Sequence, residues 1–222
     1  MSVIRPAGDT GAADPAVTAA LAAYAAGRAA EHVVLTAVAA SRLLVPVVAV
    51  LTEANDDGTE KETEMALPTL IGNDGRKAVI AFTGTDTVKR WRADARPVPV
   101  PAPNLWPAVA AEQADAVVVD VAGPVPLVIE GARLRALANG APPPLPHEDP
   151  DIRAEVAAVT ENFTLEPGTE STEGTESAED ADGPELTITL KAADPAVARA
   201  AAEQIAARLA PRLRKGIAFR FG

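Results

Sequence analysis

The stretch LPTLIGNDGRKAVIAFTGTDTVKRW, residues 67–91, carries the clearest local folding signals in the chain. Two apolar runs flank the triplet at 73–75, Asn-Asp-Gly, whose residues are typical of a tight turn between antiparallel strands. The stretch therefore predicts a β-hairpin in which Gly75 adopts a positive φ angle. The second apolar run ends at Phe82, and the residues after it predict a turn from a strand into a helix.

This strand-to-helix turn, TGTDTVKRW, has two readings. In the first, Thr85 is the N-cap of a short helix, Gly84 eases the bend, and Trp91 lies on the buried face, so the polar groups serve structure alone. In the second, free backbone N–H groups beside Lys89 and Arg90 hold an anion. The candidate ligand or partner surface is the set Thr83, Gly84, Thr85, Lys89, Arg90 and Trp91.

Outward from this stretch, the pattern alternates between strands and helices. RLLVPVVAVL (42–51) predicts a strand buried on both faces, and the alternating prolines of RPVPVPAPNL (96–105) require an extended chain. Asp-Pro pairs at 14–15, 149–150 and 194–195 each predict a helix start, with Asp as N-cap and Pro at the first helical position. Further expected elements are a helix over 29–40, a polar-edged strand at 60–67, a helix over 105–114 capped by Asn104, strands in AVVVDVAG and VPLVIE, and a helix in GARLRALANG closed by Gly140.

The carboxy-terminal third has its own order of elements. The helix after Asp149 is followed by FTLEP, ELTITLK, the helix after Asp194 and GIAFRF, in which Ile217, Phe219 and Phe221 are expected to face inward. The predicted fold class is α+β, as two small layered α/β-sheet domains, the second with the order α-β-β-α-β. The predicted domains are a flexible N-terminus at 1–13, an α+β domain at 14–140, a proline-rich linker at 141–148, and a small α+β domain at 149–222 with a disordered acidic loop at 167–184.

Composition excludes several classes of function. The 222 residues carry a formal net charge of -11, which argues against a nucleic-acid partner and against an anionic membrane surface. Eight acidic residues and no basic residue lie between 166 and 185. This loop is expected to be a solubilising spacer, and the alternative is that it binds cations weakly or contacts a basic partner. Cysteine is absent, which removes thiol nucleophiles and persulfide carriers, and no secretory signal is visible, which fits a cytoplasmic protein.

The remaining candidates for chemistry are few. The two histidines, His32 and His147, lie far apart in sequence, so neither a histidine metal centre nor a catalytic triad is expected. The acids at 115, 120 and 130 lie at predicted strand ends, where carboxylates normally meet water. We therefore expect no catalytic residues, no metal and no cofactor, and a protein or a small ligand as the partner.

The order of these pieces resembles a known family. Val45-Pro46, the hairpin at Asp74-Gly75, the strand end at Phe82-Thr83 and Trp91 are similar to the amino-terminal domain of SseB-family proteins, over roughly residues 15–140. The resemblance implies an α+β domain of bacterial cytosolic proteins, with names linked to serine sensitivity and loosely to type III secretion. It implies no catalytic residues, so no site is carried over. The favoured hypothesis is a non-catalytic binding module, and the alternative is a regulator or enzyme that binds a nucleotide or phosphate at 83–92.

Overall fold

The computed structural model describes residues 9–51, 63–66, 68–106, 109, 112–168 and 183–222. These residues form two compact units. The first lies within Met1–Thr18 and Val38–Leu134, and the second comprises Ala19–Ala37 and Arg135–Gly222. The units place residues 19–37 with the carboxy-terminal part of the chain, whereas the predicted domains divide at the proline-rich linker. That domain division remains a prediction, because compactness does not test which part folds alone.

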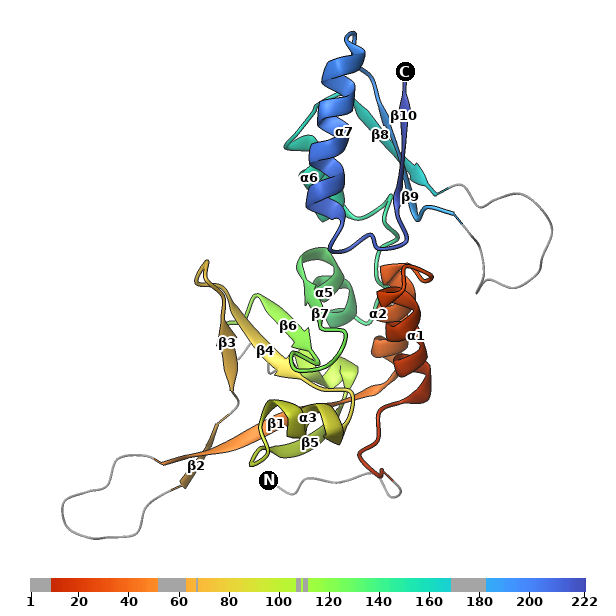
Figure 1. Cartoon of the computed structure of the whole chain (residues 1–222). Helices are drawn as coiled ribbons and strands as arrows, with labels where there is room; N and C mark the ends of the chain where they lie inside the picture. The colour runs from red at the N-terminus through yellow and green to blue at the C-terminus, as the bar shows by residue number, and fades with distance from the viewer. Residues whose placement is uncertain (1–8, 52–62, 67, 107–108, 110–111, 169–182) are drawn as a thin grey trace. The chain divides into compact units, whose positions relative to one another are not determined.

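The fold class is α+β, as predicted, and the strands of the described residues form three sheets (Figure 1). The first unit contains two of them. One has the order β2-β1-β5, and the other has the order β3-β4-β6-β7. Its strands are β1 (Arg42–Leu51), β2 (Thr63–Ala66), β3 (Thr69–Ile71), β4 (Lys77–Ala81), β5 (Arg96–Pro101), β6 (Ala116–Val119) and β7 (Leu127–Glu130). Its helical elements are α3 (Thr85–Trp91) and the 3-10 helix η1 (Ala102–Leu105). An isolated bridge between Leu44 and Phe82 joins β1 to the end of β4.

Strand β5 shows why a proline-rich segment can still pair in a sheet. The backbone N–H of Ala102 donates to the Ser41 carbonyl at 3.1 Å, so even-numbered residues of β5 direct their N–H groups toward β1. The prolines at 97, 99 and 101 are odd-numbered, and their missing N–H groups fall on the outer edge. β5 is an edge strand, which is the position where a sheet tolerates proline.

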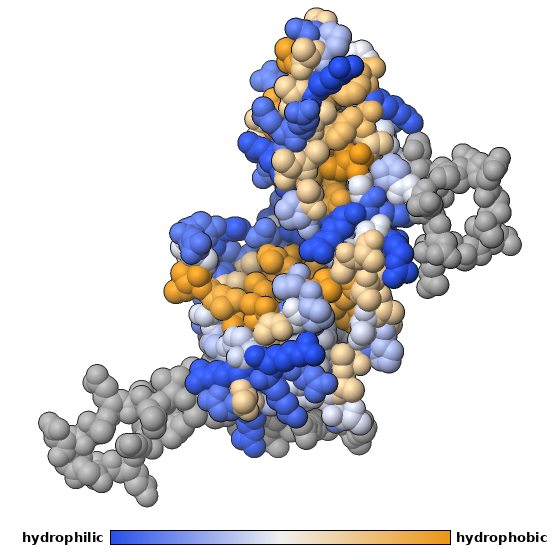
Figure 2. Space-filling view, viewed as in Figure 1, coloured by the Kyte–Doolittle hydropathy of each residue, from blue (hydrophilic) through white to orange (hydrophobic). Residues whose placement is uncertain are grey.

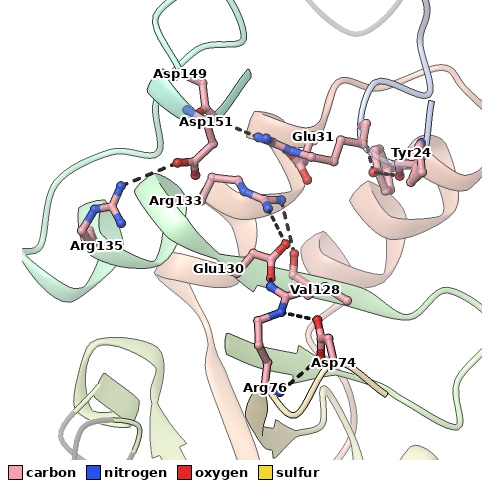
Figure 3. Close-up of polar contacts among 12 residues, drawn as sticks. Tyr24, Glu31, Asp74, Arg76, Val128, Glu130, Arg133, Arg135, Asp149 and Asp151 are labelled. Carbon is pink, nitrogen blue, oxygen red and sulfur yellow. Dashed lines mark hydrogen bonds and ion pairs between the residues drawn. The ribbon is translucent and has the colours of Figure 1, made fainter. Parts of the chain in front are cut away.

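The predicted hairpin is confirmed. β3 and β4 pair antiparallel, and Gly75 has a φ of 80°. The turn is tied to the far edge of the same sheet, because the Arg76 guanidinium contacts Asp74 and Glu130, each at 2.6 Å (Figure 3). These are partly exposed contacts, so they set the orientation of the turn more than they stabilise it.

One helix prediction near this region needs correction. Gly84 is the N-cap of α3 and makes no side-chain cap, so the predicted cap at Thr85 is wrong. Thr85 instead stands at the first helical position, and its N–H is used elsewhere. Asn104 lies inside η1, and the cap predicted there concerns the helix that would follow it. Residues 107–108 and 110–111 of the helix predicted over 105–114 lie outside the described residues.

The part of the second unit that begins at Asp149 has the predicted order α-β-β-α-β. Its elements are α6 (Pro150–Ala157), β8 (Phe163–Pro167), β9 (Leu186–Leu190), α7 (Pro195–Leu209) and β10 (Ile217–Phe221). Asp149 and Asp194 cap their helices as predicted, each accepting from a backbone N–H at 2.8 Å. The sheet order is β10-β9-β8, with β9 and β10 parallel and β8 antiparallel to β9. Residues 169–182 of the predicted acidic loop lie outside the described residues.

The core of the second unit lies between the sheet and its two helices (Figure 1). It is formed by the apolar residues Ile152, Val156, Leu186, Ile188, Leu190, Ala202, Ile205, Leu209 and Leu213. Phe163, Leu165, Ile217 and Phe219 pack against this cluster and stay partly exposed. Phe221 was expected to face inward, but 54% of it is exposed. It lies at the end of the edge strand β10.

The described residues also form three further helices. They are α1 (Pro15–Ala25), α2 (Glu31–Ala40) and α5 (Gly131–Ala138). Asp14 accepts from the N–H of Ala16 at 2.8 Å, which confirms the first Asp-Pro helix start. α5 ends before Gly140, whose φ of 67° is the left-handed conformation expected of a helix-terminating glycine.

Candidate functional site

The strand-to-helix junction is built on a buried carboxylate. β4 and β6 are parallel neighbours, so their carboxyl ends meet at the same edge of the sheet. Asp120 follows β6 there and is 3% exposed. Its Oδ1 accepts from the Thr83 N–H at 2.9 Å, and its Oδ2 accepts from the Thr83 Oγ1 hydroxyl at 2.7 Å. The expectation that this carboxylate meets water is therefore wrong, because the parallel pairing places it against Thr83.

Residues 9–13 cover the other side of the junction. The Gly11 carbonyl accepts from the Thr85 N–H at 2.8 Å. Gly84 lies so close to Ala13 that a Cβ at residue 84 would stand 2.9 Å from the Ala13 backbone nitrogen, which explains the glycine. The junction backbone is therefore covered by the chain itself.

Arg42, at the start of β1, holds this arrangement together. Its Nε and Nη2 donate to the two carboxylate oxygens of Asp9 at 2.9 and 3.0 Å. Its remaining bonds go to backbone carbonyls, from Nη1 to Thr83 and from Nη2 to Ala12, each at 2.6 Å. A two-pronged guanidinium–carboxylate contact fixes geometry better than a single ion pair does.

The six predicted surface residues do not share one surface. Thr83 and Gly84 are buried, and Thr85 is half-buried. Lys89 and Arg90 are exposed on α3. Trp91 is half-buried beside the cluster of Leu44, Ile80, Phe82 and Val88, with its ring centroid 5.6 Å from that of Phe82. Lys89 and Arg90 are therefore accessible to solvent, Thr85 and Trp91 are accessible in part, and Thr83 and Gly84 are not.

This geometry disfavours an anion at the junction. The N–H groups of Thr83 and Thr85 already donate within the chain, so neither is available to a phosphate. The Asp120 carboxylate adds a negative charge directly beneath them, and like charges at close range in a buried site repel strongly. The arrangement can position a helix, and it offers few free donors to a ligand.

A second polar cluster lies in the second unit. Arg212 follows α7 and bonds two carboxylates at once: Nη2 donates to Asp149 at 2.5 Å and to Glu31 at 3.1 Å. The side chains of Asp149 and Glu31 are 1% and 6% exposed, so this is a buried charge network. It joins the starts of α2 and α6 to the end of α7.

Glu185 and Tyr24 extend this cluster. Glu185 accepts from the N–H of Glu31 at 3.3 Å and from the N–H of Lys215 at 3.2 Å, so one carboxylate links the start of α2 to the segment before β10. Burial raises the pKa of Glu185 from 4.5 to about 7, against the lowering effect of these two bonds. The Tyr24 hydroxyl donates to the carbonyls of Pro211 and Arg212, and burial raises its pKa to about 12.

Comparison with protein families agrees with the order of elements. The family model of the SseB protein N-terminal domain matches residues 17–136, which is more than half of the chain. The chain belongs to the SseB family. No curated protein and no solved structure matches it. The match ends before the proline-rich linker, so this SseB-family chain carries a carboxy-terminal α-β-β-α-β segment beyond the matched domain.

Sequence reasoning missed the Arg212 cluster of this SseB-family protein. Asp149 was singled out only as a helix cap, and it also fulfils that role here. Arg212 is one of several basic residues in PRLRK, and nothing local distinguishes it from its neighbours. Its buried position follows from where α7 ends relative to α2 and α6, which is tertiary information.

The part of the chain that the structure describes shows neither a metal-binding cluster nor a membrane-spanning helix. No group of three or more His, Cys, Asp or Glu residues is placed there so that it could hold a metal ion. Among the helices described, none combines the length and apolar character needed to cross a bilayer. His32 is partly buried, and burial, followed by the charge of Lys215, lowers its pKa, which favours the neutral imidazole.

Glu185→Gln is expected to change the pH dependence of stability. The folded-state pKa of Glu185 is raised above 4.5, so its stabilising effect is fully present below pH 4.5 and is lost as pH rises to about 7. The wild type should therefore lose up to about 3 kcal/mol relative to Glu185→Gln across this window, with no further change above it. Urea unfolding at several pH values measures the difference.

The control for this prediction is Glu203→Gln, which removes an exposed carboxylate from α7 of the same unit. Its stability should follow the wild-type pH profile. If Glu185→Gln also follows that profile, Glu185 does not titrate between pH 4.5 and 7 as its surroundings indicate.

Proposed function

We propose that this SseB-family chain is a non-catalytic binding module that contacts another protein through α3. The proposal rests on which polar groups of the junction bond within the chain and which remain exposed to solvent. The Thr83 and Thr85 donors are used inside the chain, while Lys89 and Arg90 remain exposed on the helix that follows. The bacterial cytoplasm is the proposed location, which the absence of cysteine supports.

The chemistry of α3 favours an acidic partner segment. The chain has a net charge of -11, yet its α3 surface carries Lys89 and Arg90, with Arg92 just beyond and bonded to Asp94. Figure 2 shows this strongly hydrophilic surface over α3. Trp91 is half-buried beside these cations, and Trp and Arg are the residues most enriched at the energetic centres of protein interfaces.

The experiment compares partners captured from a cell lysate by the immobilised full chain and by charge-reversed variants. Lys89→Glu/Arg90→Glu should lose specific bound proteins, because acidic groups would then face acidic groups. Lys191→Glu/Arg199→Glu is the matched control, since it makes the same charge change at exposed residues of the second unit. Capture that is equal for both double variants would contradict binding through α3.

Thermal scans separate this proposal from the small-anion alternative. A ligand that binds only the folded state raises the melting temperature by mass action. We expect no rise with millimolar phosphate or ATP. A rise that disappears in Arg90→Ala would favour the alternative, in which 83–92 binds an anionic small ligand.

A further inference from the structure

The outer edge of β10 has its polar groups aligned for pairing. β10 is the edge strand of the sheet β10-β9-β8. The Gly216 carbonyl accepts from the Glu185 N–H at 3.0 Å, and the Gly222 N–H donates to the Leu190 carbonyl at 3.1 Å. Even-numbered residues of β10 therefore direct their backbone groups toward β9. In the same strand, the backbone groups of Ile217, Phe219 and Phe221 point to the opposite edge.

The same three residues carry the strand's incompletely buried apolar side chains. Ile217 and Phe219 are half-buried, and Phe221 is 54% exposed. Hydrophobic surface is visible along the strip between α7 and β10 in Figure 2. The one charged residue of the strand, Arg220, lies on the other face of the sheet and pairs with Glu166 of β8 at 3.3 Å.

The edge strand β5 of the first unit is closed to pairing. β5 places Pro97, Pro99 and Pro101 where its outward N–H groups would be, so its outer edge offers no donor at these positions. Proline and inward-directed charge are the usual protections of an edge strand. β10 contains no proline, and its one charged side chain, Arg220, is paired with Glu166 of its own sheet.

We propose that β10 pairs antiparallel with β10 of a second copy of this chain, in a register centred on Phe219. In this register Phe219 lies opposite Phe219 of the partner copy, and Ile217 lies opposite the partner copy's Phe221. All outward N–H and C=O groups of these residues then pair, giving about six hydrogen bonds. The sheets of the two copies become one continuous sheet.

Charge and side-chain contacts agree with this register. Arg220 lies opposite Ala218 of the partner copy, so no like charges stand directly opposite each other. Each Arg220 also has the Glu166 carboxylate of its own copy as a counter-charge. The exposed Phe221 ring gains an apolar neighbour in Ile217 of the other copy.

The contact is small, so the dimer is weak. One five-residue edge with two aromatic rings buries far less than the roughly 1,200 Å² at the low end of stable interfaces. We therefore expect a dissociation constant between about 10 µM and 1 mM.

Sedimentation equilibrium of the full chain up to about 1 mM tests the pairing. The wild type should dimerise reversibly. Phe221→Pro should weaken dimerisation at least about tenfold, because it removes an outward donor that takes no part in the bonds to β9. Val197→Ala removes an apolar side chain that is 60% exposed on α7, and it should leave the dissociation constant unchanged. A monomeric wild type, or a dimer unaffected by Phe221→Pro, would overturn the proposal.

Engineered cysteines test the register without relying on stability, since the chain has no cysteine of its own. Ala218 and the partner copy's Arg220 form a closely spaced, non-hydrogen-bonded pair in the proposed register. An equal mixture of Ala218→Cys and Arg220→Cys chains in a glutathione redox buffer should give disulfide-linked dimers. Each variant alone should give at least about fivefold less, because each cysteine then faces a non-cysteine residue. Equal cross-linking in all three samples would rule out this register.

Discussion

Arg212→Ala is expected to lower the free energy of unfolding by about 3–5 kcal/mol, the largest effect of any exchange considered for this protein. The guanidinium lies between the buried carboxylates of Asp149 and Glu31. Its removal takes away the cation that both carboxylates contact in a region with little water. Breaking one side of a buried ion pair is costly because the remaining charge has lost its solvation as well as its partner.

The matched control for this prediction is Arg208→Ala, one residue before the end of α7. Arg208 contacts Glu155 at 3.1 Å, but both side chains are about half exposed. This exchange should cost less than about 1 kcal/mol, since exposed ion pairs contribute little. Urea unfolding monitored by circular dichroism measures both variants. Equal losses would show that burial of the Arg212 network adds nothing beyond an ordinary surface pair.

Asp120→Ala is expected to cost about 2–4 kcal/mol. The exchange removes both acceptors of Thr83 and leaves its buried N–H and hydroxyl without them. It also places alanine at a φ of 53°, a left-handed conformation that alanine adopts less readily than asparagine or glycine.

Two variants separate these contributions. Asp120→Gly removes the carboxylate but accepts the backbone conformation, so it should be less destabilising than Asp120→Ala by about 1 kcal/mol. Asp94→Ala removes an exposed carboxylate from the loop after α3, and its effect should stay below about 0.5 kcal/mol. If Asp120→Ala unfolds at the same urea concentration as Asp94→Ala, the carboxylate does not hold the junction.

Asp120 lies in the first unit and Arg212 in the second, so their removal should affect the proposed binding surface on α3 differently. Loss of Asp120 should disturb the start of α3 and therefore the proposed contact surface at Lys89 and Arg90. Loss of Arg212 should act on the carboxy-terminal unit alone. A partner that no longer binds Asp120→Ala but still binds a folded Arg212→Ala variant would place binding on the first unit.

Local sequence determined most of the secondary structure and the family. The turn triplet at 73–75 required a positive φ at Gly75. Each Asp-Pro pair supplied both the N-cap and the first helical residue. Both signals act within a few residues. The alternating prolines of β5 excluded a helix by covalent geometry alone. The resemblance to SseB proteins rested on the order of such signals.

Tertiary structure decided which polar side chains are buried and which apolar side chains remain exposed. Thr83 was expected at a surface but is buried, because β4 and β6 run parallel and bring Asp120 to its side. Arg212 is the centre of a charge network because α7 ends beside the starts of α2 and α6, where Glu31 and Asp149 lie. Phe221 fits the inward pattern of its strand, yet its position at a sheet edge leaves it exposed. Alternation along a strand determines which way a side chain points, whereas its burial depends on which other element covers that position, and this information lies far away in the sequence.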